Sequence, residues 1–171
     1  AYGELTGDPQ YLKRAIAIGD WEIEIQAPNG GVYSNPTPGS IRVFNTGQVM
    51  LGWCLLYEQT GQQKYLDATI RAGDYLKGCQ EKDGSWENDT YSGARTYETR
   101  VDWALLRLAQ LSGDNTYQDT AIKNLRWVLS KQRENGWFDH CGFNDDLPIM
   151  HTIIYTLRGL LECELMGEDA L

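Results

Sequence analysis

The sequence lacks long apolar segments and is short of positive charge. No run of 18 consecutive apolar residues occurs among its 171 residues, so no membrane-spanning helix is expected. Fifteen Lys and Arg residues stand against 24 Asp and Glu, which gives a net charge of −9. This charge argues against nucleic acid and anionic membrane surfaces as partners. It does not exclude a small ligand, since the local charge of a cleft can oppose the net charge.

Disulfide and metal-site patterns are also missing. The four cysteines are far apart and form no Cys-x-x-Cys pair (Cys54, Cys79, Cys141 and Cys163). We therefore expect reduced, mostly buried thiols in a cytoplasmic protein. A catalytic pair of Cys141 with His140 is the alternative for that one cysteine. The two histidines, His140 and His151, are not at a recognisable metal-ligand spacing, so neither a metal nor another cofactor is predicted.

One pattern of about 53 residues occurs three times in the chain. Three glycines that end one passage and begin the next are 54 and 52 residues apart (Gly7, Gly61 and Gly113). Three glutamines repeat with the same spacings (Gln26, Gln80 and Gln132). A glycine follows each glutamine by four residues (Gly30, Gly84 and Gly136). A fixed period of this size predicts stacked helical units.

Each unit is predicted to pair an outer helix with an inner helix. In the second unit, apolar residues recur with helical periodicity from Tyr65 to Leu76, with charged residues between them. This pattern is typical of an amphipathic helix with one solvent-exposed face. The later segment "TRVDWALLRLAQLSG" is apolar nearly all round, so it must be covered on both sides. The predicted fold is all-α, with three tandem α-hairpins in a single domain covering residues 1–171.

The connections between these helices differ in length. Gly61, Gly113 and Gly167 lie in short turns on one face, and each is expected past a helix C-terminus with a positive φ angle. The loops 27–46, 81–99 and 133–152 lie on the opposite face and are each about 20 residues long. Long ordered loops often carry function, so we expect any site on that face.

The repeats resemble two known groups of helical proteins. "WVLSKQRENGWF" and "YLKGCQEKDGSW" look like the Gln-Trp repeat of squalene and hopene cyclases. The alternation of outer and inner helices resembles the α/α toroids of unsaturated glucuronyl hydrolases, N-acylglucosamine epimerases and polysaccharide lyases. "VFNTGQVMLGW" and "GWFDHCGF" look closest to uncharacterised bacterial toroid proteins grouped with polysaccharide processing. The resemblance implies a half or partial α/α toroid.

Two departures from these families affect the interpretation. The Asp-x-Asp-Asp motif of the cyclases is absent, and "FNDDLPIM" supplies only Asp145 and Asp146. A six-hairpin ring needs six units, whereas this chain holds three. Because an uncapped repeat array exposes apolar faces, we expect either a homodimer or the remainder of a longer toroid to complete it.

The strongest catalytic candidates are Glu98 and Asp102, which are four residues apart and share a helix face. A carboxylate pair suits general acid–base work on a glycosidic bond. The alternative is structural: Glu98 completes a helix start, and Asp102 pairs with Arg42 or Arg95. His151 heads the third inner helix and suits an acid or base near neutral pH, although a capping role is also open.

Residues for substrate binding are predicted at the inner-helix N-termini and in the third loop. Asn45, Tyr97 and Arg100 enter helix ends, whose free N–H groups favour anionic groups. In "GWFDHCGFNDD", Asp139 is a catalytic candidate beside two substrate-binding candidates, Trp137 and His140. Aromatic rings beside carboxylates suit sugars. The alternative is a loop pinned by buried rings, with Trp137 packing between helices.

The leading functional prediction is a carbohydrate-active or saccharide-binding protein. If it is an enzyme, we expect a glycoside hydrolase, lyase or epimerase. One alternative is an isoprenoid or terpenoid cyclase-like enzyme. The other is a non-catalytic helical scaffold, or a fragment of a larger toroid.

Overall fold

A computed structural model describes residues 7–35, 39–144 and 149–167. The described residues form six α-helices and one short 3₁₀ helix, η1 (Thr96–Glu98). The α-helices are α2 (Gln10–Glu24), α3 (Val43–Thr60), α4 (Gln63–Cys79), α5 (Thr99–Ser112), α6 (Asn115–Leu129) and α7 (Met150–Met166). The only β-type pairings among the described residues are two isolated bridges, Tyr33 with Ile41 and Gln132 with Phe138. The predicted all-α hairpin fold is confirmed.

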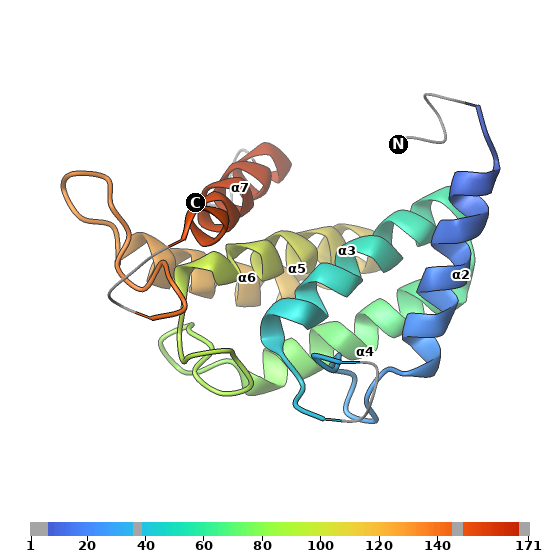
Figure 1. The fold of residues 1–171 in the computed structure, drawn as a ribbon, viewed down its shortest axis with the longest axis horizontal. Helices are drawn as coiled ribbons and strands as arrows, with labels where there is room; N and C mark the ends of the chain where they lie inside the picture. The colour runs from blue at the N-terminus through green and yellow to red at the C-terminus, as the bar shows by residue number, and fades with distance from the viewer. Residues whose placement is uncertain (1–6, 36–38, 145–148, 168–171) are drawn as a thin grey trace.

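The inner helices α3, α5 and α7 pack in series, and Figure 1 shows α2 and α7 at opposite ends of the array. Two glycines allow the close approach of the inner helices. A Cβ atom on Gly47 would lie 2.9 Å from the Cα atom of Val101, and one on Gly159 would lie 2.2 Å from Oγ1 of Thr99. The outer helices α4 and α6 cover the other side of α3 and α5.

The core lies between these inner and outer helices, where the sequence pattern placed it. The Trp53 indole N–H donates to the carbonyl of Gly19 over 3.1 Å, and the Trp86 indole N–H donates to the carbonyl of Leu76 over 3.0 Å. Each ring therefore fills the core while its one polar atom finds a backbone acceptor.

Two of the three short turns have the predicted conformation. Gly61 and Gly113 are left-handed, with φ angles of 66° and 74°, and their N–H groups donate to Tyr57 and Ala109. The prediction is wrong at Gly167, whose φ angle is −148°. There α7 ends with a bond from Gly167 to the carbonyl of Glu164, and the chain leaves in an extended conformation. A left-handed residue is needed only where the chain reverses directly after the helix.

The repeated glutamines and glycines form three equivalent turns. Each glutamine Nε2 donates to the carbonyl of the glycine four residues later, over 2.8, 3.0 and 3.3 Å for Gln26, Gln80 and Gln132. The three glycines have φ angles of 92°, 95° and 85° (Gly30, Gly84 and Gly136). These positive values explain why glycine recurs at that position.

The first two glutamines also bind the following outer helix. Gln26 Nε2 donates to the carbonyl of Ala68 in α4 over 3.0 Å, and Gln80 Nε2 donates to the carbonyl of Thr120 in α6 over 2.8 Å. The repeated glutamine therefore holds its own loop and ties one unit to the next.

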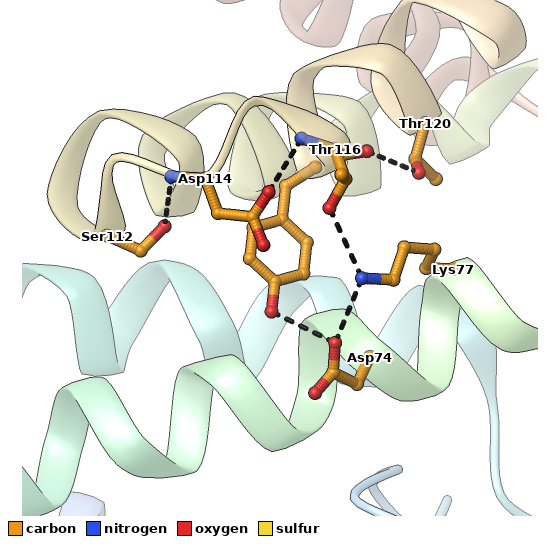
Figure 2. A network of polar contacts seen from close by, with 7 residues as sticks. Asp74, Lys77, Ser112, Asp114, Thr116 and Thr120 are labelled. Atoms are coloured by element: carbon orange, nitrogen blue, oxygen red, sulfur yellow. Dashed lines mark hydrogen bonds and ion pairs between the residues drawn. The ribbon is translucent and has the colours of Figure 1, made fainter.

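Outer helices are also joined directly by polar contacts. The Tyr117 hydroxyl donates to Asp74 over 3.0 Å, and the in-register Tyr65 hydroxyl donates to Asp20 over 2.8 Å. Figure 2 shows Lys77 of α4 between Asp74 and Thr116, at the start of α6. These bonds fix the register of α6 on α4.

Candidate functional site

A pocket of about 230 Å³ lies where the long loops meet the inner helices. We call it the aromatic pocket. It is lined by α3, by η1, by α7 and by the second and third long loops, through Phe44, Asn45, Tyr91, Tyr97, Phe143, His151, Thr152 and Tyr155. It lies on the long-loop face, as the sequence predicts for a site.

The rings of the aromatic pocket contact one another edge to face or at a tilt. Phe143 is central: its ring centroid is 5.7 Å from Tyr97, 6.1 Å from Tyr91 and 5.5 Å from the imidazole of His151. Tyr155 continues the set, at 5.6 Å from His151. Such pairs hold one another in place and leave ring faces and edges available to a ligand.

Polar groups in the aromatic pocket come from the helix ends. The Tyr91 hydroxyl donates to Oδ1 of Asn45 over 2.9 Å, which orients the amide so that its N–H groups are the remaining donors. Arg42 lies over the Tyr91 ring at 5.3 Å. The Thr152 hydroxyl donates a hydrogen bond to the carbonyl of Ile149 over 2.8 Å. A few polar groups among apolar rings are typical of a small-molecule site.

The structure brings together three of the nine predicted site residues. Asn45, Tyr97 and His151 come from three different repeats and all line the aromatic pocket. The three residues occupy corresponding positions in their repeats, in or just before the first turn of an inner helix. This correspondence explains why their side chains lie close together. Their roles in substrate binding and catalysis remain predictions.

Glu98 and Asp102 are buried rather than presented in the aromatic pocket. Neither carboxyl has a hydrogen-bond partner among the described residues, so neither the helix cap nor the pairing with Arg42 or Arg95 is seen. Burial raises the pKa of Glu98 to about 8. Burial, and secondly the charge of Glu98, raises the pKa of Asp102 well above its usual value. Protonated carboxyls are therefore favoured here near neutral pH.

The other predicted site residues also lie outside the lining of the aromatic pocket. Arg100 donates from Nε to Gln48 over 2.8 Å and stacks on Tyr155 at 5.3 Å. Asp139 is in an ion pair with Arg133, which lowers the pKa of that carboxyl.

Trp137 and His140 face outward from the third loop. Both side chains are exposed, and His140 has a left-handed φ angle of 58°. The carbonyl of His140 accepts a hydrogen bond from the N–H of Thr96, which ties the loop to η1. Their substrate-binding roles remain predictions. Asp145 and Asp146 lie outside the described residues.

The cysteines are free thiols, and all except the half-buried Cys79 are buried. Burial raises the pKa of Cys54 to about 12 and also raises that of Cys163, which agrees with core positions. The Sγ atom of Cys141 lies 3.6 Å from the Thr156 hydroxyl, so the partner observed for it is a hydroxyl rather than an imidazole.

Sequence reasoning missed five residues that line the aromatic pocket: Phe44, Tyr91, Phe143, Thr152 and Tyr155. Tyr91 and Phe143 stand in the long loops, where their aromatic character was the available signal. Phe44 and Tyr155 belong to inner helices, and the corresponding positions of the second unit hold Thr96 in η1 and Val101 in α5, so the repeat gave no signal for them.

The described residues offer no group of three or more His, Cys, Asp or Glu side chains that would hold a metal ion. Within the same part of the chain, every helix is too short or too polar to cross a membrane.

Comparison with family models decides the family. Residues 21–155 match the model described as β-L-arabinofuranosidase, GH127 catalytic domain. The chain belongs to this family. The chain thus belongs to a family of carbohydrate-active proteins and has an α/α-toroid type of fold, and the terpenoid cyclase alternative has no support. Comparison with curated protein sequences gives no match.

Two solved structures share the fold of this GH127 chain. One is a family 76 glycoside hydrolase (mannosidase), Bt3792, from Bacteroides thetaiotaomicron VPI-5482, at 19% identity and a TM-score of 0.73, covering 98% of this chain and 52% of that one. The other is a family 76 glycoside hydrolase from a bovine Bacteroides thetaiotaomicron strain, with the same identity, TM-score and coverage of this chain, and 41% of its own length covered. This chain thus spans about half the length of these structures.

Proposed function

We propose that this chain supplies a saccharide-binding part of a glycoside hydrolase that acts on a β-L-arabinofuranoside. The aromatic pocket carries the proposal. It is small enough to select a single sugar unit, its rings suit the C–H face of a sugar, and Asn45 offers amide donors to hydroxyl groups. The family supplies the sugar class, since its description is β-L-arabinofuranosidase.

His151 is the proposed acid or base of the aromatic pocket. Its imidazole is exposed and lies between the rings of Phe143 and Tyr155, at 5.5 and 5.6 Å. A histidine in this position is within reach of a bound sugar and can transfer a proton to or from it. Glu98 and Asp102 remain catalytic candidates only if the buried pair becomes accessible, because substrate cannot reach them in the described arrangement.

The test compares binding of methyl β-L-arabinofuranoside and methyl mannoside by saturation-transfer NMR on the purified chain. We expect binding of the arabinofuranoside, and a loss of at least tenfold in affinity for Asn45→Ala and His151→Ala. Lys123→Ala, on the exposed side of α6, is the control and should bind as the unaltered chain does. Equal binding in all variants would show that the aromatic pocket is not the sugar site.

Hydrolysis of an aryl β-L-arabinofuranoside, followed by release of the phenol, tests the enzymatic part separately. Binding without turnover would leave a saccharide-binding unit and reject catalysis by this chain alone. We further propose that residues 1–171 act as one domain and that another helical unit completes the toroid. The cytoplasmic location expected from the sequence stays a prediction.

A further inference from the structure

Arg100 lies beside the aromatic pocket and has no carboxylate partner among the described residues. The inner helices α3, α5 and α7 hold two other arginines. Both of these are in ion pairs, Arg107 with Glu58 and Arg158 with Glu162. Within the described part of the chain, the charge of Arg100 is therefore the one on the inner helices that no protein carboxylate balances.

Residues from all three repeats hold the Arg100 guanidinium in place. Its Nε atom donates to Oε1 of Gln48 in α3, over 2.8 Å. The ring centroids of Trp103 in α5 and Tyr155 in α7 lie 5.5 and 5.3 Å from its Cζ atom. Rings at these distances attract the charge of a guanidinium and restrict its orientation. The group is thus oriented before any ligand binds.

The terminal nitrogens of Arg100 are left to a ligand. The side chain is half-buried, and no bond from Nη1 or Nη2 to another described residue occurs. The paired N–H groups of a guanidinium match the two oxygens of a carboxylate. Burial, as the largest cause, lowers the pKa of Arg100, because the charge has lost part of its hydration. A bound carboxylate would offset this cost.

The charges around the aromatic pocket also favour an anion. No Asp or Glu of the described residues lines the pocket, although the net charge of the chain is −9. A second guanidinium, that of Arg42, lies over the Tyr91 ring at 5.3 Å and has no carboxylate partner in the same part of the chain. The buried Glu98 and Asp102 add little negative charge near neutral pH, because burial raises both pKa values. The local charge is therefore opposite in sign to the net charge.

Tyr155 connects Arg100 to the aromatic pocket. Its ring lines the pocket and lies 5.6 Å from the imidazole of His151, and the Arg100 guanidinium lies over the same ring. Arg100 itself is not part of the lining. A ligand that fills the pocket therefore reaches Arg100 through a further group that is attached to it.

We propose that Arg100 binds the carboxylate of an acidic unit, such as a uronic acid, that is attached to the sugar in the aromatic pocket. This role rests on the proposed function, in which the pocket holds an arabinofuranose. Nη1 and Nη2 donate to the two carboxylate oxygens, while Gln48 and Tyr155 hold the guanidinium in position. Arg100 thereby selects arabinofuranosides with an acidic neighbour over those with a neutral one.

Two ligands that differ in charge but hardly in shape test this role. They are 4-carboxyphenyl β-L-arabinofuranoside and its 4-carboxamide analogue, each titrated into the purified chain by calorimetry. We expect the carboxylate to bind about fivefold more tightly at low ionic strength, and this ratio to decrease with added salt. Equal affinities would overturn the role of Arg100 and leave the sugar site standing. If neither ligand binds, the proposed function fails, and this proposal fails with it.

Three variants distinguish Arg100 from the overall charge of the chain. Arg100→Gln should reduce the affinity ratio to about one. Arg100→Lys should retain part of the ratio, since lysine keeps the charge but loses the paired donors, and it replaces the glutamine variant if that one does not fold. Arg126→Gln removes the same charge from an exposed position of α6 and should leave the ratio unchanged. An equal decrease in Arg100→Gln and Arg126→Gln would assign the preference to net charge and overturn the proposal.

Discussion

Helices α3 and α7 occupy the same place in their repeats but differ in burial. α3 (Val43–Thr60) is enclosed by α2, α4 and α5, and eight of its residues are buried. α7 (Met150–Met166) has a higher proportion of large apolar side chains facing solvent, and four of its residues are buried, namely Thr152, Thr156, Gly159 and Cys163. The comparison teaches that an apolar repeat pattern marks a surface to be covered, and that neighbours decide whether the cover is present.

The largest expected effect on stability comes from comparing a buried residue of α3 with an exposed residue of α7. Trp53→Ala removes a buried ring and its bond to Gly19, and should lower the free energy of unfolding by about 3–5 kcal/mol. Leu165→Ala, at an exposed position of α7, should cost less than about 0.5 kcal/mol. Urea denaturation of both variants measures the difference. Similar costs would mean that α7 is covered in solution.

A second prediction concerns the position that α3 and α7 fill with a threonine and that Glu98 of η1 fills in the second unit. Thr46 is satisfied by a bond to the Arg42 carbonyl, whereas the Glu98 carboxyl has no partner among the described residues. The folded pKa of Glu98, about 8, lies above its ordinary 4.5, so the folded state binds this proton more tightly. The contribution of Glu98 to stability should therefore be largest below pH 4.5 and be lost as the pH rises to about 8.

Glu98→Gln should flatten this decline and make the chain more stable than the unaltered one above pH 8. Thermal unfolding from pH 5 to 9 measures it. Asp102→Asn is the matched comparison, because that carboxyl is equally buried and its pKa is also raised. A profile with the same slope in Glu98→Gln would show that Glu98 does not titrate in the buried site.

A third prediction compares the complete and incomplete glutamine turns. Gln80→Ala removes bonds to two carbonyls, one of them in the next outer helix, and should cost about 1–2 kcal/mol. Gln132→Ala removes one longer bond in an exposed loop and should cost less than about 0.5 kcal/mol in the monomer. Chemical denaturation at low protein concentration compares them.

The smallest effect contrasts the two kinds of short turn. Gly113→Ala forces a side chain into a left-handed conformation and should cost about 1 kcal/mol. Gly167→Ala should be nearly neutral, because the φ angle there is −148°. Differential scanning calorimetry of the pair measures this contrast. Equal melting temperatures for the two variants would show that the left-handed conformation of Gly113 does not contribute to stability.

Much of the fold could be predicted from the sequence, because the repeated residues reflect local requirements of the backbone. Helical periodicity, glycine after Gln80, and glycine past α3 and α5 each reflect a local requirement of the backbone. Gly167 did not follow the pattern, since α7 ends there in an extended conformation. The lining of the aromatic pocket was predicted less well: the sequence named its face and Asn45, Tyr97 and His151, while Phe44 and Tyr155 do not recur between repeats and so left no signal.

The sequence by itself determined the helices, their pairing in three units, the spacing of the turns and the face that holds the long loops. These features depend on local backbone preferences and on apolar periodicity, both of which are written along the chain. Only the tertiary structure decided that Glu98 and Asp102 are buried together, that Phe143 joins His151 to Tyr97, and which apolar side chains of α7 are exposed among the described residues. Burial and contact between distant segments depend on which neighbours pack, and a pattern within one segment does not contain that information.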